Sequence, residues 1–428
     1  MSSVSYGSKN LVIDNGSYEI KMGYMGEKLP ITVPNCIVRS KDRKVYIGDQ
    51  LNYLSDVSQV QIRRPFEKGQ LTSWELEKHI WDYSLVEKLR VNNDLGNFND
   101  TNLILTETPF SLPQLSKNCD QIVFEEYNFN SYYRTPVASL IPWNIKSNRL
   151  LLNDDGPIDK PYDDFQLIVD SGFNCTWVIP VIYGVVYWKG VKKLAIGGRL
   201  LSGYLRELIS FRYYDVTDET LLVNNIKEKS CFVAQDYNQT ISDMINLKNS
   251  KKNTDSNLMV EYVLPDFKTT TTGYILTKEM KKQKTASELE NLLVLKLYDE
   301  RISTPELLIH PEIAQLKKKG LTSTIIDSIQ SSPELARPLL AANIILIGGN
   351  FKIPGFKERI LKNLKENLPD FYNTRIGLDK EKCTTYGWES GCKLFENKDI
   401  GFNKVCITKE EYLEHGVNWC AKRFNFNY

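Results

Sequence analysis

One short motif occurs twice in this chain of 428 residues, and its repetition limits the folds available to the chain. Segment 11–17 (Leu-Val-Ile-Asp-Asn-Gly-Ser) is echoed by segment 167–172 (Leu-Ile-Val-Asp-Ser-Gly), far too long a spacing for a solenoid repeat. A second strand-like run follows each copy, at 18–24 and at 176–183. Each copy therefore predicts a β-hairpin with its aspartate beside the turn. Two such units predict two similar α/β domains that face one another.

Composition narrows the class of protein. Apolar residues make up 42% and charged residues 25%, the balance of a soluble globular chain with two or three domains. The net charge of +1 argues against nucleic acid as the principal partner. No apolar run approaches the ~20 residues of a membrane span, and segment 1–10 lacks a secretory signal. Eight scattered cysteines without a Cys-x-x-Cys pair predict free thiols in the cytosol or nucleus.

Periodicity places the elements around the two hairpins. We expect a helix from Trp74, a buried strand at 102–106 and a second helix from Pro113. In the second half, further helices are predicted at 200–211, 220–233, 322–329 and 333–340 and from about Gly355, with a strand at 343–347. A capping box at Thr408 begins another helix. Segment 146–164 is polar and predicts a linker, whereas 248–257 and 269–292 predict exposed polar segments.

Each motif has an ordinary structural explanation when it is taken alone. The Asp14 and Asp170 motifs are common turn sequences, and Gly348-Gly349 after a strand allows close helix packing. Together they suggest a phosphate-binding site, because turns of Gly, Ser and Asn can enclose a phosphate chain from both sides. An aspartate in each turn could hold magnesium through water. Neither a Walker loop nor a G-x-G-x-x-G motif occurs.

The ordered set of motifs resembles the actin family over nearly the whole chain. The segments that carry the resemblance are 11–17 with Lys21, 103–112, 122–127, 225–229, 263–266, 347–356 and 407–412. The resemblance implies an α/β, actin-like ATPase fold with two domains (four subdomains) around a central nucleotide cleft. It also implies ATP with Mg as a structural cofactor. The implied binding residues are Asp14, Asn15, Gly16, Ser17, Lys21, Asp170, Ser171, Gly172, Lys227, Glu228, Gly348, Gly349 and Asn350, with Asp14 and Asp170 facing the metal through water.

The resemblance also divides the chain into subdomains. The large subdomain of the first half would comprise 1–35, 70–145 and 383–428, and its small subdomain 36–69. After the linker at 146–163, the large subdomain of the second half would comprise 164–196 and 313–382. Its small subdomain would comprise 197–312, with the polar insertion 269–292.

Departures from actins bear on activity. At the two positions where actins place water-positioning Gln and His side chains, this chain carries Val137 and Trp177. Neither side chain can orient or deprotonate water, so the resemblance implies ATP binding with little or no hydrolysis and no catalytic residues. Tyr18 and Phe173 add bulk to the two phosphate loops, and Ile353 replaces an aromatic residue over adenine.

A second departure concerns assembly. Only segment 39–44 stands where actins carry the long loop of the longitudinal filament contact, so we expect no filament. Segments 63–72, 170–180 and 414–424 resemble the sixth, nuclear class of actin-related proteins. That class implies a scaffold in a SWR-type remodelling complex that deposits a variant histone. The implied partners are a zinc-finger HIT protein and the motor ATPase.

The same resemblance sets further expectations and leaves two alternatives. It implies that the nucleosome is contacted indirectly or weakly, with no membrane association, in the nucleus and also the cytoplasm. Trp419 and the insertion 269–292 are candidate docking surfaces. The alternative hypotheses to this scaffold are an actin-fold metabolite kinase and a filament-forming cytoskeletal relative of actin.

Overall fold

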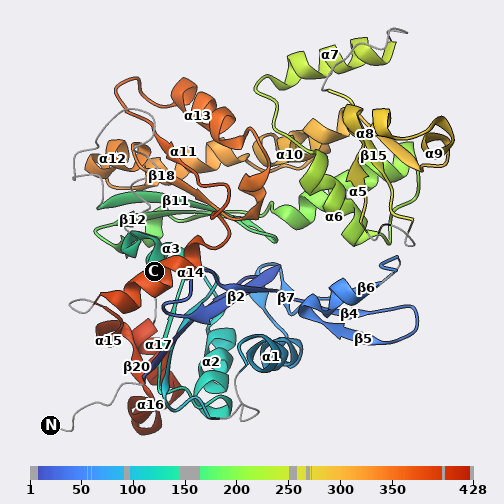
Figure 1. The fold of residues 1–428 in the computed structure, drawn as a ribbon. Coiled ribbons are helices and arrows are strands. Elements are labelled where there is room, and N and C mark those ends of the chain that lie inside the picture. Colours follow the sequence, from blue (N-terminus) through green and yellow to red (C-terminus); the bar gives the residue numbers. More distant parts are fainter. Residues whose placement is uncertain are drawn as a thin grey trace.

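A computed structural model shows two α/β halves, one above the other (Figure 1). It describes residues 8–424 except 55, 59, 91–96, 145–163, 250–257, 267–269, 271 and 398–400. The linker expected at 146–163 and most of the polar segment expected at 248–257 lie outside the described residues. The α/β class and the two similar domains predicted from the sequence are confirmed.

The first half is built on a six-stranded sheet in the order β20-β10-β9-β1-β2-β3. Strand β1 pairs antiparallel with β2 and parallel with β9, and β9 pairs parallel with β10. All six residues of β9 are buried, as expected of a central strand covered on both faces. The bounds are β1 Lys9–Asn15, β2 Glu19–Tyr24, β3 Ile31–Pro34, β9 Thr101–Thr106, β10 Ser131–Thr135 and β20 Ile407–Thr408.

The second half repeats this topology in the order β13-β12-β11-β18-β19, with β14 also beside β12. Strand β11 pairs antiparallel with β12 and parallel with β18, as β1 does with β2 and β9. The repeated motif therefore marks two equivalent hairpins in equivalent sheets, as the sequence predicts. The bounds are β11 Phe165–Ser171, β12 Thr176–Ile182, β13 Val185–Val186, β14 Lys192–Leu194, β18 Ile344–Ile347 and β19 Ile376–Gly377.

The predicted helices form, with small shifts at their ends. Ser73 caps α1 (Trp74–Tyr83) by accepting a bond from the Leu76 N–H, and Thr408 begins α16 with the predicted capping box. The helix expected over 220–233 ends three residues early, because extended Cys231 closes α6. The other helices of the two large subdomains are α2 Pro113–Gln121, α3 Val137–Leu140, α11 Leu321–Ser331, α12 Arg337–Ala341, α13 Phe356–Asn367, α14 Tyr386–Glu396, α15 Phe402–Val405, α16 Lys409–His415 and α17 Val417–Phe424.

A small sheet flanks each half. In the first, β5-β4-β6 (Val45–Ile47, Ile37–Arg39 and Gln61–Arg63) encloses its own apolar cluster, and a tight turn joins β4 to β5 across 40–44. The two-stranded hairpin β7-β8 (Phe66–Glu67 and Gln70–Leu71) follows. The short connection expected from the sequence is thus a plain hairpin turn.

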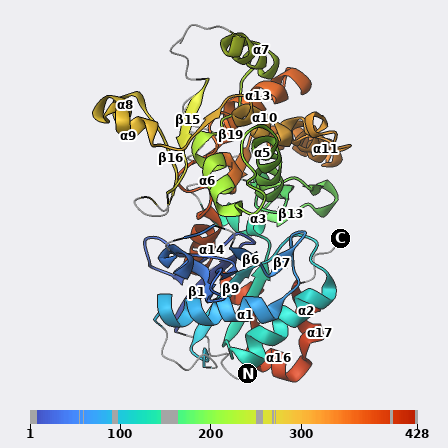
Figure 2. The same cartoon turned by 90° about the vertical axis from the view of Figure 1, so that its right-hand side faces the viewer.

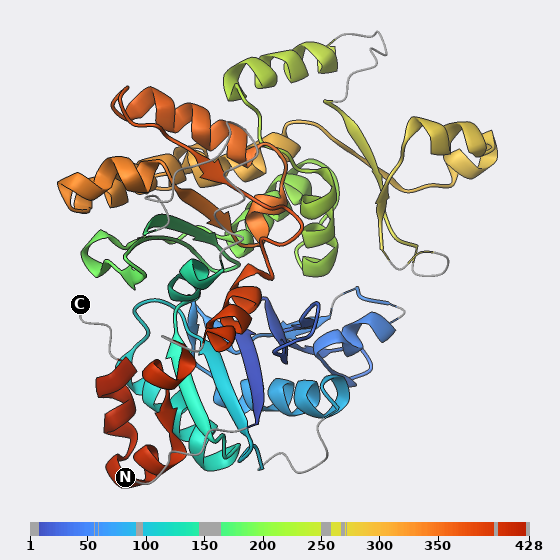
Figure 3. The ribbon, with the colours of Figure 1, turned by 60° about the vertical axis from the view of Figure 1, so that its left-hand side comes forward.

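The second small subdomain pairs β16-β15-β17 (Tyr274–Ile275, Val260–Val263 and Val294–Leu297). The described part of segment 269–292, predicted as an exposed polar insertion, forms β16 and two short helices with no buried residue. Figures 2 and 3 show these helices projecting from the body. The helices of this region are α5 Gly198–Arg212, α6 Thr220–Ser230, α7 Tyr237–Asn249, α8 Lys278–Gln283, α9 Ala286–Glu290 and α10 Glu300–Ile309.

Three further expectations can be compared with the fold. All eight cysteines are buried free thiols. Among the described residues, no helix is both long and apolar enough to cross a membrane. Trp419 in α17 is half buried against the apolar cluster of the first half, so only part of this side chain is available to a partner.

Candidate functional site

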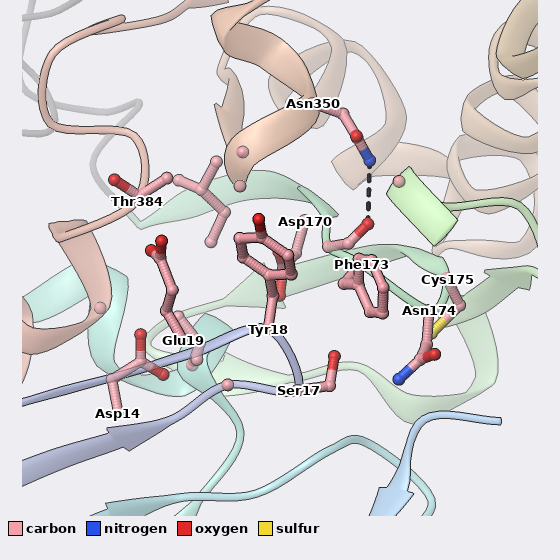
Figure 4. Close-up of a pocket in the computed structure, with 18 of the residues that line it drawn as sticks. Asp14, Ser17, Tyr18, Glu19, Asp170, Phe173, Asn174, Cys175, Asn350 and Thr384 are labelled. Atoms are coloured by element: carbon pink, nitrogen blue, oxygen red, sulfur yellow. Dashed lines mark hydrogen bonds between the residues drawn. The ribbon is translucent and has the colours of Figure 1, made fainter. Parts of the chain in front are cut away.

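The two repeated hairpins face one another across a cavity of about 420 Å³ between the halves (Figure 4). This volume lies within the usual range for small-molecule sites. Of the binding residues predicted from the sequence, all but Ser171 line the cavity. Those that do are Asp14, Asn15, Gly16, Ser17, Lys21, Asp170, Gly172, Lys227, Glu228, Gly348, Gly349 and Asn350.

The first loop is held rigidly by the neighbouring strand. The Thr106 hydroxyl donates to Asp14 Oδ1 at 2.7 Å and accepts from the Asn15 N–H at 2.8 Å. Lys21 lies opposite Asp14 in the hairpin register, with its Nζ 3.9 Å from Asp14 Oδ2. A Cβ on Gly16 would lie 2.5 Å from the Glu19 carbonyl oxygen, so this turn requires glycine. The loop therefore presents one carboxylate and one ammonium group to the cavity.

The second loop carries the matching aspartate. Burial, and then the nearby charge of Asp14, raises the pKa of the Asp170 carboxyl to about 7, although Lys21 opposes the shift. The Ser171 hydroxyl, which the sequence assigned to the ligand, turns inward instead. It bonds with Thr176 Oγ1 at 2.8 Å and accepts from Asn350 Nδ2 at 3.0 Å. Ser171 therefore supports the loop from behind.

Asn350 and the glycine pair fasten the second loop to β18. Asn350 Nδ2 also donates to the Gly172 carbonyl at 2.9 Å, and Figure 4 marks a bond from Asn350 to this loop. Gly348 has a φ of +101°, and a Cβ there would lie 2.3 Å from the Ser171 carbonyl oxygen. The glycine is thus required for close approach of two backbones at the cavity wall.

The far end of the cavity is walled by α6. Lys227 is buried, and its Nζ donates to Asn224 Oδ1 at 2.8 Å, Ser202 Oγ at 3.0 Å and the Gly198 carbonyl at 3.4 Å. These three acceptors match the three donors of an ammonium group. Burial lowers the pKa of Lys227. In this arrangement the side chain shapes the wall, and a ligand would have to replace one of its bonds.

The donors and acceptors present fit a phosphate chain with a divalent cation. Two carboxylates, Asp14 and Asp170, repel one another at the cavity, and a cation between them would relieve that repulsion. Asn174 Nδ2 is a buried donor without a hydrogen-bond partner on the cavity wall. Ser17 faces it from the other loop (Figure 4), and Lys21 adds a positive charge. Unpaired buried donors are costly, so an anionic ligand would satisfy Asn174.

The cavity wall beside the aspartates contains no proton acceptor at the two positions singled out in the sequence. Val137 and the buried Trp177 both line the cavity. The Trp177 ring packs 5.9 Å from the Phe110 ring, and Lys193 Nζ lies 5.0 Å from its centroid. Hydrocarbon and indole surfaces there cannot take a proton from water.

Sequence reasoning missed one feature of the site. The sequence predicts only added bulk from Tyr18 and Phe173, and Arg64 is singled out only as part of segment 63–72. In the structure these three side chains stack together at the cavity. Their positions are 46 and 109 residues from Arg64, so no local pattern could bring them together. The available signal in the sequence was that both loops carry an aromatic residue, Tyr18 and Phe173, and that an arginine, Arg64, occurs elsewhere in the chain.

Comparison with known proteins gives consistent matches over nearly all of the chain. The actin family profile matches residues 6–425. The chain is 45% identical to actin-like protein ARP6 of Kluyveromyces lactis, over 97% of this chain and 98% of that protein. It is 42% identical to actin-like protein ARP6 of Candida glabrata and 39% identical to that of Saccharomyces cerevisiae, again over 97% of this chain and 98% of each relative.

Proposed function

Because the chain belongs to the actin family, we propose that it is a non-catalytic, actin-related subunit of a SWR-type chromatin-remodelling complex that deposits a variant histone. The observation that carries this proposal is the similarity to ARP6 proteins across 97% of the chain. The stretches 63–72, 170–180 and 414–424, which resemble the sixth class of actin-related proteins, support it further.

In this role the cleft would bind ATP with magnesium as a structural ligand. Asp14 and Asp170 would hold the cation through water, and Ser17, Lys21 and Asn174 would contact the phosphates. When bound, the nucleotide would bridge the two halves through its negative charge. Val137 and Trp177 stand at the two positions where actins orient and deprotonate the attacking water, and neither side chain can do so; turnover is therefore expected to be far below that of actin.

Assembly would occur with partners and not with copies of the chain. The net charge of +1 provides little affinity for DNA phosphates, so contact with the nucleosome would be weak or pass through other subunits. The proposed partners are a zinc-finger HIT protein and the motor ATPase. The short turn across 40–44 supports a non-filamentous state, because no long loop is present there. The protein would act in the nucleus and also occur in the cytoplasm.

Affinity purification tests the proposal directly. The tagged full chain is isolated from nuclear extract, and co-eluting proteins are identified by mass spectrometry after size fractionation. We expect stoichiometric recovery of a motor ATPase and a zinc-finger HIT protein in a large assembly. A cytosolic protein carrying the same tag is the control. Elution only as a free species of about the mass of one chain would contradict the proposal.

A further inference from the structure

Four side chains, one from each predicted subdomain, meet in the cleft between the two halves. Tyr18 comes from the first loop and Phe173 from the second, and Figure 4 shows their rings beside one another. Arg64 follows β6 of the first small subdomain, and Asn224 lies in α6 of the second. No sequence neighbourhood unites them, so their meeting depends on how the two halves are packed.

The centre of this group is a cation held over two aromatic rings. The Tyr18 and Phe173 centroids lie 5.1 Å apart with a tilt of 39°. The Arg64 guanidinium carbon lies 4.6 Å from the first centroid and 4.9 Å from the second. Arg64 Nη1 also donates to the carbonyls of Tyr18 at 2.9 Å and Asn35 at 3.0 Å, which fixes the guanidinium group. Aromatic pairing and cation–π attraction therefore act together across the cleft.

The Tyr18 hydroxyl makes a second connection across the cleft. It accepts a hydrogen bond from Asn224 Nδ2 at 3.0 Å, and the same amide nitrogen donates to Glu228 Oε1 at 2.7 Å. Burial, and then the charge of Glu228, raises the pKa of Tyr18, so its hydroxyl stays neutral. The phenol thus links the first loop to the helix that walls the far end of the cavity.

We propose that Tyr18, Phe173, Arg64 and Asn224 form a clasp that holds the cleft closed through protein contacts. Opening the cleft must separate the two rings and break the bond to Asn224. If the cleft binds nucleotide, which rests on the proposed function, the clasp also sets how fast nucleotide enters and leaves. Its closing effect does not depend on nucleotide.

Amide hydrogen exchange in the second half can reveal the effect of removing Tyr18, which belongs to the first half. The Gly198 N–H donates to the Gly172 carbonyl at 3.0 Å, and the Arg199 N–H donates to the Phe173 carbonyl at 2.8 Å. These amides become exposed when the second loop moves. Removing the Tyr18 ring should therefore change their exchange, although Tyr18 belongs to the other half.

The experiment compares three variants of the full chain without nucleotide, using exchange read by mass spectrometry. Tyr18→Ala should accelerate exchange at Gly198 and Arg199 about tenfold, the loss expected for an aromatic pair with its cation. Tyr18→Phe keeps the ring but loses the bond to Asn224, so its effect should be smaller. Tyr53→Ala is the control, because that ring is exposed and lies outside the clasp. Unchanged exchange in folded Tyr18→Ala would overturn the proposal.

Release of a fluorescent ADP analogue separates this proposal from the proposed function. Tyr18→Ala should release the analogue faster than both the wild type and Tyr53→Ala. If the wild type fails to bind the analogue, the proposal that the cleft binds nucleotide is wrong. The hydrogen-exchange data still test whether the clasp holds the cleft closed. Binding with equal release rates in all variants would show that the clasp does not gate the cleft.

Discussion

Asp170 is predicted to lower the stability of the folded protein. Its carboxyl has a pKa of about 7 in the fold, against an ordinary value of 3.8, because it is buried beside Asp14. The folded state therefore retains a proton between pH 4 and 7 that the unfolded state releases. Since the folded state binds more protons in this window, stability must fall as the pH rises through it. Replacing Asp170 with neutral Asn should remove that loss.

The magnitude follows from the two pKa values. At pH 8 the full shift corresponds to a ceiling of about 4 kcal/mol, and at pH 5 the remaining difference corresponds to under about 2 kcal/mol. Because Asp170 is only partly buried, solvent screening reduces both figures. Asp170→Asn should thus increase the free energy of unfolding without nucleotide, at least twice as much at pH 8 as at pH 5.

Urea denaturation followed by circular dichroism at the two pH values measures this difference. Asp218→Asn provides the matched control, because it makes the same chemical change at an exposed site. A second readout tests the proposed role in binding: Asp170→Asn should gain stability yet lose the stabilisation expected from Mg-ATP. The reasoning is refuted if Asp170→Asn destabilises the protein at pH 8, or if its effect is the same at both pH values.

Three further predictions follow from the site and the core. Mg-ATP at a thousandfold excess over its Kd should stabilise the wild type by about 4 kcal/mol, measured as a raised melting temperature. Asp14→Ala should abolish this rise. If no nucleotide raises the melting temperature of the wild type, the pocket does not bind nucleotide. Purified protein should stay in the supernatant after high-speed centrifugation with magnesium, potassium and ATP, and a pellet would contradict the argument from the short turn at 40–44. Asp120→Ala should cost about 3 kcal/mol in urea denaturation, because it leaves Arg134 buried with only Glu107 as its acidic partner, whereas the exposed control Asp218→Asn should change little.

Local patterns in the sequence account for much of the fold. A hairpin depends on residues that are close together in the chain, so the two copies of the motif predict β1-β2 and β11-β12 without knowledge of their surroundings. The caps at Ser73 and Thr408 likewise involve a residue three positions away. The repetition also predicts two similar α/β domains, but it does not identify β9 and β18 as the parallel partners of the hairpins.

Side-chain direction and contacts between distant segments could not be predicted in this way. Ser171 belongs to a correctly predicted loop, yet packing against Asn350 turns its hydroxyl away from the cavity. Lys227 lines the wall as expected, but its donors are taken by neighbours. A sequence motif specifies residue types, whereas the partners available to each polar group depend on which elements pack around it.

The repeated hairpins, the aspartate in each, and the lack of a proton acceptor at Val137 and Trp177 can all be predicted from the amino-acid sequence. The packing of Tyr18 against Phe173 under Arg64, and its bond to Asn224, 206 positions away in the chain, depend on the tertiary fold. Hairpins and caps arise from backbone geometry over a few residues, so they are encoded locally. Contacts across the cleft exist only because two separately encoded halves dock in one orientation, and that orientation results from the packing of the whole chain.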